Sequence, residues 1–404
     1  MKKISGGVCA PKGFRAAGVH CGVRKNKDRR DLALIACEKD CTAAAVYTRN
    51  RVKAAPVYLN MKHMESGKMR AILCNSGNAN ACAPNGMAAA QRMCMAAGEA
   101  LSAPAEKIFV CSTGVIGVEL DVTPIERAMP ALCAALSEQG GDDAAHAILT
   151  TDTVKKEIAV SSIIGGREVR IGAIAKGSGM IHPNMGTMLC FITTDAAIER
   201  SLLDRALRAC VDRTFNRVSV DGDTSTNDTA VILASALAAN PLIADEGEEY
   251  QAFCAMLYTV CEYLAKAIAR DGEGATRLVA CTVSGAADET HAAHLAKSVI
   301  SSSLTKAAMF GADANWGRVI CAMGYSGEEF DPEQVEISFA SCKGEITVCQ
   351  NGRGLAFDEI KAKDILSQDE VEIRVTLAEG SACATAWGCD LTYDYVKING
   401  DYRT

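Results

Sequence analysis

Strand-like and helix-like stretches alternate along this chain, and the alternation restricts the possible folds more than any other feature of the sequence. A short apolar run of the β type, residues 71–74, leads into a loop rich in asparagine and glycine. The alanine-rich segment 86–101 then has the composition of a helix. The same order of strand, turn and helix returns over residues 107–117 and 125–136. The sequence therefore predicts a mixed α/β fold.

The second half of the chain keeps this alternation. A strand pattern covers residues 168–179, and an amphipathic helix pattern covers residues 202–215. A helix around residues 289–304 is followed by further strand-like runs. Because 404 residues exceed the usual size of one compact domain, we expect two lobes. The clearest helix covers residues 249–271, where one face carries apolar side chains at spacings of three and four: Phe253, Leu257, Val260, Leu264 and Ile268.

The charge balance argues against a nucleic-acid partner. The formal net charge is −7, and the longest basic block is the short segment 24–30. The N-terminus lacks the apolar centre of a secretory signal. The longest apolar stretch, residues 230–244, is interrupted by polar residues and is too short to cross a bilayer. We therefore expect a soluble, cytoplasmic protein with no membrane partner.

The cysteines do not have the pattern of a disulfide or zinc framework. There are nineteen, an odd number, and no C-x-x-C pair occurs. Apolar neighbours surround most of them, which is typical of small core residues in a reducing compartment. His291 and His294 lack the spacing of a zinc site and are assigned to a solvated helix face, and the acidic segment 218–229 lacks the closing glutamate of a calcium loop and is assigned to a turn. We therefore predict no bound metal.

One threonine, Thr187, stands where a glycine-rich segment meets the apolar run 188–192. A threonine at the start of a strand is common, because β-branched side chains suit a pleated surface. It becomes a nucleophile when its own amine is free to act as the base, which requires that the Gly186–Thr187 bond be cut. Gly186 suits such a cut, since a residue without Cβ lets the backbone strain and lets the Thr187 hydroxyl approach the preceding carbonyl. Cleavage there would give fragments 1–186 and 187–404.

Two further segments have both an ordinary and a functional interpretation. In "CSTGVIG", Gly114 is either a turn glycine or, with the Thr113 hydroxyl, a donor to the oxyanion of an acyl transfer. In "AKGSG", the pattern of a phosphate loop is incomplete. Lys176 is therefore either a point charge for a substrate carboxylate or the solvated end of a strand. Spacing alone leaves these alternatives open.

Taken together, the motifs resemble those of the ornithine acetyltransferase family, also called the bifunctional glutamate N-acetyltransferase / amino-acid acetyltransferase family of arginine biosynthesis. Many separate motifs occur in the family's order over nearly the whole chain, which makes the resemblance specific. The segments that carry it are "GFRAAGVHCGV", "TRNRVKAAPV", "CNSGNANAC", "STGVIG", "AKGSGMIHPNMGTML", "SVDGDTSTND", "DGEGATR", "GADANWGR" and "INGDYRT".

The resemblance implies a fold and a division of the chain. The expected fold is a mixed α/β sandwich core of the self-processing threonine-nucleophile type with a smaller C-terminal α/β lobe. Residues 1–186 would form an α chain, residues 187–280 would complete the core, and residues 281–404 would form the lobe. The α and β chains would stay together, and a heterotetramer is the expected assembly.

The resemblance also implies a reaction and the residues that perform it. After self-cleavage between Gly186 and Thr187, Thr187 would be the nucleophile, with Thr113 and Gly114 as the oxyanion hole. The acetyl group would pass from N2-acetylornithine to Thr187 and then to glutamate, a ping-pong reaction without a cofactor, while acetyl-CoA is a second co-substrate of the bifunctional members. The substrate carries a carboxylate and an ammonium group. We assign one of these charged ends to the cation Lys176 and the other to the anion Glu273. The implied substrate-binding positions are Thr153, Lys176, Thr187, Glu273, Asn399 and Thr404.

The sequence departs from the family pattern at the junction and in one turn. The junction is "HPNMGT", with His182 and Gly186 where alanines are expected, and Ala314 replaces a proline in "GADANWGR". Neither change touches a side chain with an implied catalytic role. Two other functions remain open: a self-processed threonine aminopeptidase or amidase, in which water takes the acyl group, and an uncleaved protein that binds amino acids without turnover.

Overall fold

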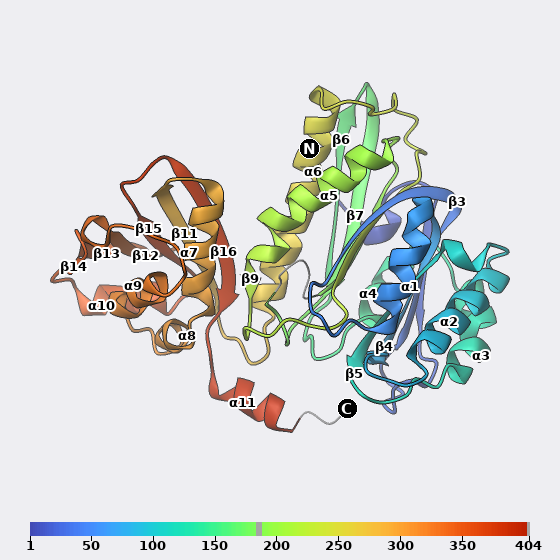
Figure 1. Ribbon diagram of the computed structural model, residues 1–404, viewed down its shortest axis with the longest axis horizontal. Helices are drawn as coiled ribbons and strands as arrows, with labels where there is room; N and C mark the ends of the chain where they lie inside the picture. The colour runs from blue at the N-terminus through green and yellow to red at the C-terminus, as the bar shows by residue number, and fades with distance from the viewer. Residues whose placement is uncertain (183–187, 402–404) are drawn as a thin grey trace.

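Two sheets with helices packed against them make up the computed structural model, which describes residues 1–182 and 188–401 (Figure 1). Within these residues the first sheet has nine strands in the order β1-β6-β7-β8-β10-β3-β4-β5, with β2 also paired to β3. The second sheet has seven strands in the order β14-β13-β12-β15-β11-β16-β9. The predicted mixed α/β fold with a second, smaller α/β unit is confirmed. The division of the chain at residues 186 and 280 stays a prediction.

The elements have the following bounds. The nine-stranded sheet contains β1 (Lys2–Ile4), β2 (Phe14–Val19), β3 (Leu32–Tyr47), β4 (Lys68–Asn78), β5 (Ile108–Val115), β6 (Lys156–Ile164), β7 (Arg167–Lys176), β8 (Leu189–Thr194) and β10 (Thr229–Ala234). The seven-stranded sheet contains β9 (Val218–Ser219), β11 (Leu278–Ala286), β12 (Glu336–Ser341), β13 (Gly344–Gln350), β14 (Arg353–Gly354), β15 (Glu370–Thr376) and β16 (Ala382–Cys389). The α-helices are α1 (Ala55–His63), α2 (Gly86–Ala100), α3 (Thr123–Ala134), α4 (Gly141–Ala147), α5 (Arg200–Arg213), α6 (Glu248–Arg270), α7 (Glu289–Ser301), α8 (Ser303–Phe310), α9 (Trp316–Gly324), α10 (Glu359–Leu366) and α11 (Tyr393–Gly400).

Strand β8 lies in the middle of the nine-stranded sheet. It pairs antiparallel with β7 and parallel with β10, and β10 in turn pairs antiparallel with β3. All six residues of β8 are buried, as the apolar run 188–192 predicts for most of them. The strands β8 and β10 are therefore inserted between strands that come earlier in the chain.

Helices cover the nine-stranded sheet on both faces. The apolar sides of α5 and α6 pack on the strands β6, β7, β8 and β10, while α2 and α3 pack on β3, β4 and β5. The opposite face is closed by α4 and by the chain near Val8 and Phe14. The face predicted for the helix at 249–271 is confirmed, because each of its five apolar side chains is at most 1% exposed. By length and composition α6 could cross a membrane, but its apolar side is part of this core.

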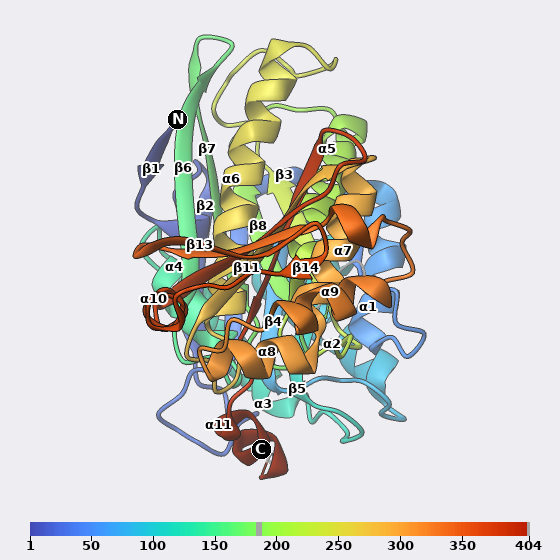
Figure 2. The same ribbon diagram turned by 90° about the vertical axis from the view of Figure 1, so that its left-hand side faces the viewer.

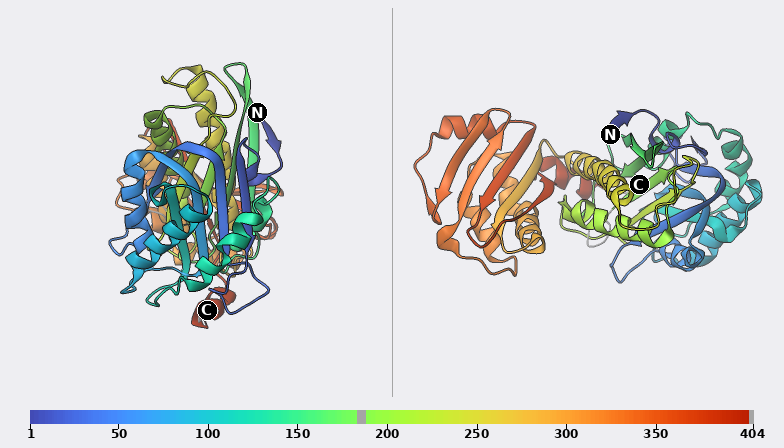
Figure 3. Two further views of the ribbon diagram at one scale, coloured as in Figure 1. Left: turned by 90° about the vertical axis from the view of Figure 1, so that its right-hand side faces the viewer. Right: turned by 90° about the horizontal axis from the view of Figure 1, so that it is seen from above.

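The seven-stranded sheet forms a separate body next to α6, which is clear when the molecule is seen from above (Figure 3). Its own core is formed by α7, α9 and α10 together with alternate residues of β11, β12, β15 and β16. After β16 the chain returns toward the larger unit, and α11 lies at the lower end of the molecule in two views (Figures 1 and 2). This return brings the C-terminal helix to the functional site described below.

Two local predictions need correction. The helix expected around residues 289–304 is divided into α7 and α8 at Ser302, whose side chain accepts a hydrogen bond from the Thr305 N–H and so begins a new helix. His291, which was assigned to a solvated face, is 9% exposed, because α7 turns it toward Glu379 at 3.7 Å. His294 does lie on the exposed side.

The cysteines behave mainly as core residues. All nineteen are free, and twelve of them are buried. Among the residues that the structure describes, no group of three or more His, Cys, Asp or Glu side chains could hold a metal ion. Segment 218–229 begins in β9 and ends in β10, and in the loop between these strands Asp221 accepts hydrogen bonds from the N–H groups of Met180 and Ile181.

Candidate functional site

A cavity of about 350 Å³ lies where the ends of β5 and β7 meet segment 225–227 and the C-terminal helix α11. It contains five of the residues to which the sequence assigns a role, and these come from four separate parts of the chain: Thr113, Gly114, Lys176, Glu273 and Asn399. Its other lining residues are Ala79, Val115, Ile116, Thr150, Thr151, Gly179, Met180, Ser225, Thr226 and Asn227.

Thr113 and Gly114 line the cavity from the end of β5. Gly114 has a φ of +133°, which favours glycine, and it packs against the backbone of Gly77 in the neighbouring strand β4. A Cβ at position 114 would lie 2.3 Å from the Gly77 carbonyl carbon. A glycine is therefore required here both by the backbone conformation and by the close approach of the two strands. The Thr113 hydroxyl lies 3.4 Å from Lys176 Nζ.

Lys176 is the last residue of β7 and is only 8% exposed. It is therefore not the solvated end of a strand, which was one of its two interpretations. Burial lowers the pKa of its ammonium group, and the nearby Asp152 carboxylate opposes this shift. A buried cation at the wall of a cavity can attract a carboxylate, because neither charge is screened by much water.

Glu273 supplies an acidic group on the same cavity. Its side chain lies close to Gly179, where a Cβ would stand 2.3 Å from the Glu273 carboxyl carbon. Asn399 of α11 donates a hydrogen bond from Nδ2 to Glu273 Oε2 at 2.7 Å. The C-terminal helix is therefore part of the site. Thr404 lies outside the described residues.

Among the candidate site residues that the structure describes, Thr153 does not line this cavity. It borders a neighbouring hollow, and both its N–H and its hydroxyl donate hydrogen bonds to the Asp271 carboxylate. Gly186 and Thr187 lie outside the described residues. The strand that follows them, however, begins at Leu189, which pairs with Lys176 on one side and with Thr229 on the other.

A buried group of charges lies directly behind the cavity. Lys156 donates from Nζ to Asp152 Oδ1 at 2.7 Å and to Asp271 Oδ2 at 2.5 Å, and its side chain is fully buried. Asp152 also accepts hydrogen bonds from the N–H groups of Gly177 and Thr150. Burial by itself raises the pKa of Asp152, but the two lysines and these hydrogen bonds outweigh it and hold the pKa well below the ordinary value.

The Asp152→Asn variant is expected to lower the free energy of unfolding at pH 7 by about 3 kcal/mol, because it removes the Asp152 charge from two buried lysines and leaves Lys156 with Asp271 alone. A carboxyl with a depressed pKa in the folded protein stabilises the fold above its unfolded pKa of about 3.9 and loses this effect as the pH falls. Urea unfolding between pH 7 and pH 3 should therefore show a shallower loss of stability below pH 4 in the variant than in the wild type.

Asp195→Asn is the matched control for this experiment. Asp195 is equally buried and accepts hydrogen bonds from the N–H groups of Lys12 and Arg170, but burial raises its pKa. Its replacement should not flatten the acid limb. Parallel acid limbs for Asp152→Asn and the wild type would contradict the depressed pKa of Asp152.

Segment 225–227 is a wall of the cavity to which the sequence assigned no role. Asn227 donates from Nδ2 to the carbonyls of Ala79 and Ser112 at 2.6 and 2.8 Å. The segment is held from behind, since the Thr48 hydroxyl donates to the Ser225 carbonyl and the Ala54 N–H donates to the Thr226 carbonyl. The motif "SVDGDTSTND" is one of those that carry the family resemblance, but its acidic residues indicate a turn and give no role to residues 225–227.

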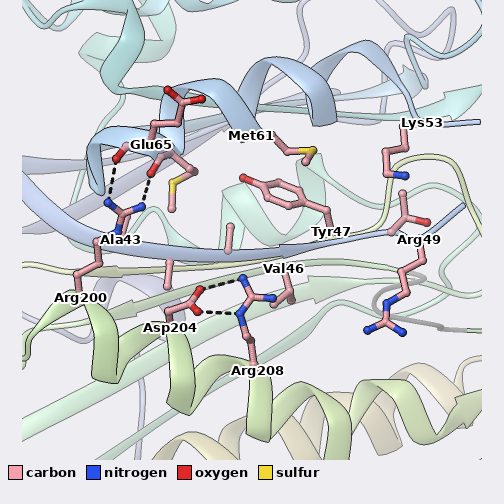
Figure 4. A pocket seen from close by; sticks show the side chains of 14 residues that line it. Ala43, Val46, Tyr47, Arg49, Lys53, Met61, Glu65, Arg200, Asp204 and Arg208 are labelled. Carbon is pink, nitrogen blue, oxygen red and sulfur yellow. Dashed lines mark hydrogen bonds and ion pairs between the residues drawn. The ribbon is translucent and has the colours of Figure 1, made fainter. Parts of the chain in front are cut away.

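A second hollow of about 570 Å³ runs along β3 between α1 and α5 (Figure 4). Its charged side chains are mostly engaged: Arg208 binds Asp204, and Arg200 donates to the carbonyls of Met64 and Glu65. Within the described part of the chain, none of the predicted site residues lines it. The 350 Å³ cavity is therefore the candidate active site.

Known proteins of similar sequence match nearly all or about half of this chain. The ArgJ family model matches residues 15–404. The arginine biosynthesis bifunctional proteins ArgJ of Caldanaerobacter subterraneus subsp. tengcongensis and Symbiobacterium thermophilum are 48% and 51% identical, and each alignment covers 100% of both chains. A crystal structure of arginine biosynthesis bifunctional protein ArgJ from Bacillus halodurans is 47% identical with a TM-score of 0.50, over 52% of this chain and 98% of that one. The resemblance found in the motifs is thereby confirmed, and the chain belongs to the ArgJ family.

Proposed function

We propose that this chain is a self-cleaving acetyltransferase of arginine biosynthesis, which moves the acetyl group of N2-acetylornithine to glutamate through an acetyl-Thr187 intermediate. The full-length relatives are named as arginine biosynthesis bifunctional proteins. The observation that carries the proposal is the cavity itself. It unites Thr113, Gly114, Lys176, Glu273 and Asn399, all of which carry a role implied by the motif resemblance.

Two observations support cleavage before Thr187. The strand β8 starts at Leu189 between Lys176 and Thr229, so the chain enters the sheet at the edge of the cavity. The similar crystal chain from Bacillus halodurans matches almost all of its own length to 52% of these 404 residues, about 210 residues. That length exceeds the 186 residues before Thr187 and fits within the 218 residues that begin with it.

The proposed reaction uses the new N-terminus of the β chain. The free amine of Thr187 takes the proton of its own hydroxyl, and the oxygen attacks the acetyl carbonyl carbon of N2-acetylornithine. The Thr113 hydroxyl and the Gly114 N–H stabilise the resulting oxyanion. The C–N bond then breaks, and the proton passes to the leaving amine of ornithine. Glutamate reverses these steps with its own amine and leaves as N-acetylglutamate.

Substrate recognition follows from the charges at the cavity. N2-acetylornithine carries an α-carboxylate and a side-chain ammonium, and we assign the first to Lys176 and the second to Glu273. Asn399 holds the Glu273 carboxylate at 2.7 Å and so limits where the ammonium group binds. Thr153 and Thr404 complete the proposed set of substrate-binding residues.

Further properties of the enzyme belong to the same proposal. The reaction needs no cofactor, and acetyl-CoA serves as a second acetyl donor if the chain has the bifunctional activity. The α and β chains remain associated as a heterotetramer in the cytoplasm.

An acetyl-exchange experiment tests this function. Purified protein with N2-acetylornithine alone should release one equivalent of ornithine per active site, and glutamate should then be converted to N-acetylglutamate in repeated turnovers. Mass spectrometry of the trapped protein should find the acetyl group on the fragment that begins with Thr187. Continuous release of acetate without N-acetylglutamate would instead identify an aminopeptidase or amidase, and ornithine binding without either product would identify a binding protein.

A further inference from the structure

We propose that Lys156 is a positioning residue that sets the separation of Lys176 and Glu273 and thereby selects the length of the diamino acid that the enzyme accepts. This inference rests on the proposed function, in which those two side chains bind the two charged ends of the substrate. Lys156 itself does not line the cavity. Its effect would pass through the two carboxylates that it joins.

The contacts of Lys156 use its full hydrogen-bonding capacity. An ammonium group has three N–H donors and no acceptor. Lys156 directs them to Asp152 Oδ1 at 2.7 Å, to Asp271 Oδ2 at 2.5 Å and to the Val154 carbonyl at 3.3 Å. Because the side chain is fully buried, no water competes for these bonds. One cation therefore links the two carboxylates to each other.

Asp152 transmits this position to Lys176. The same oxygen that binds Lys156, Oδ1, accepts a hydrogen bond of 2.7 Å from the N–H of Gly177, the residue next to Lys176. The other oxygen accepts one of 3.0 Å from the N–H of Thr150, which lines the cavity. A shift of Asp152 would consequently move the backbone that carries the cavity's cation.

Asp271 transmits the position of Lys156 to Glu273. The Asp271 carbonyl accepts a hydrogen bond of 2.7 Å from the Ser178 hydroxyl, and the Glu273 N–H donates one of 3.1 Å to the Ser178 carbonyl. Asp271 also holds Thr153 through its carboxylate. The segment 176–178 and the segment 271–273 are therefore tied to each other twice, once through Ser178 and once through Lys156.

The charges explain why the lysine is needed. Lys156 pairs with two buried carboxylates, Asp152 and Asp271, and Asp152 also attracts Lys176. Without Lys156, Asp152 would be left with Lys176 as the cation that it attracts. A buried charge without a partner is strongly unfavourable. Lys176 would then turn away from the cavity and toward Asp152.

The Lys156→Met variant tests the inference by its effect on substrate choice. Acetyl transfer to glutamate is measured with N2-acetylornithine and with N2-acetyllysine, which is one methylene longer. We expect the preference for N2-acetylornithine, as a ratio of kcat/KM values, to fall about tenfold, because one methylene is discriminated by at least about this factor in a rigid site. The KM for N2-acetylornithine should rise, while kcat should change by less than about threefold.

Asp195→Asn is the control, because it also alters a buried charge in the same sheet but has no bond to the cavity. It should keep the wild-type ratio. If Lys156→Met does not fold, Asp271→Asn keeps the shape of the side chain while weakening the bond to Lys156, and the same fall in the ratio is expected.

A variant that loses stability or kcat but keeps the wild-type ratio would show that Lys156 only supports the fold, and the inference would be wrong. If the wild-type enzyme transfers acetyl groups, that result leaves the proposed function intact. A wild type that transfers no acetyl group would overturn both.

Discussion

The Thr187→Ala variant is expected to remain one chain of 42.5 kDa, whereas the wild type should separate under denaturing conditions into fragments of about 20 and about 23 kDa. Without the hydroxyl, the Gly186 carbonyl has no nucleophile beside it. Without cleavage, position 187 also has no free amine to act as a base. Acetyl exchange should therefore fall by about 10⁴-fold or more. An intact mass spectrum and the exchange assay measure the two effects.

Thr187→Ser is the matched variant, since it keeps the hydroxyl and removes one methyl group. It should still be cleaved, and it should retain part of the exchange activity. Cleavage of Thr187→Ala at the same bond would exclude self-processing by this residue. An uncut wild type would show that the "MGT" junction is inert.

The Gly114→Ala variant is expected to lower kcat by about 10²- to 10³-fold, which is the usual effect of losing one oxyanion donor. A methyl group at position 114 would lie 2.3 Å from the Gly77 carbonyl carbon and 2.6 Å from the Asn78 nitrogen. Both contacts are with backbone, so β4 and β5 must separate at the edge of the cavity. The free energy of unfolding should fall by about 3 kcal/mol. Steady-state kinetics and urea unfolding measure the two effects.

The Gly117→Ala variant separates two consequences of a methyl group at position 114, the strain of a positive φ and the separation of β4 from β5. Gly117 also has a positive φ, +81°, but a Cβ there would have no atom within 4 Å. This variant should lose about 1 kcal/mol of stability through backbone strain alone and keep its activity. Equal losses of activity in the two variants would show that the separation of β4 from β5 does not matter to the reaction.

The elements of the fold could be predicted where the pattern is local. The apolar face of α6 and the buried run that becomes β8 are visible in the sequence, because neighbouring residues determine them. The break at Ser302 was missed because it depends on one capping hydrogen bond, and the burial of His291 depends on how α7 packs against its sheet. Long-range packing of this kind leaves no periodic signal.

The candidate site could be predicted only through its motifs. Lys176 and Glu273 are almost 100 residues apart in the chain, and their common cavity arises from contacts between segments that have no pattern in common. The pairing of Lys156 with its distant partner Asp271 leaves no sequence signal for the same reason, since Asp271 lies at the end of α6. Segment 225–227 did carry a motif, but the acidic residues before it pointed to a turn and concealed its place in the cavity wall.

The place of β8 and β10 within the nine-stranded sheet has a consequence for the lifetime of a chain that is cleaved before Thr187, as proposed. Both strands follow Thr187 in the chain, yet β7 and β3, which precede it, enclose them on either side. An uncut chain can form this arrangement within a single molecule. Two separated fragments would have to find each other by collision while their unpaired strand edges favour aggregation. Once cleaved, the protein can therefore persist in its native state but hardly regain it, and heat inactivation should become irreversible at the moment of processing.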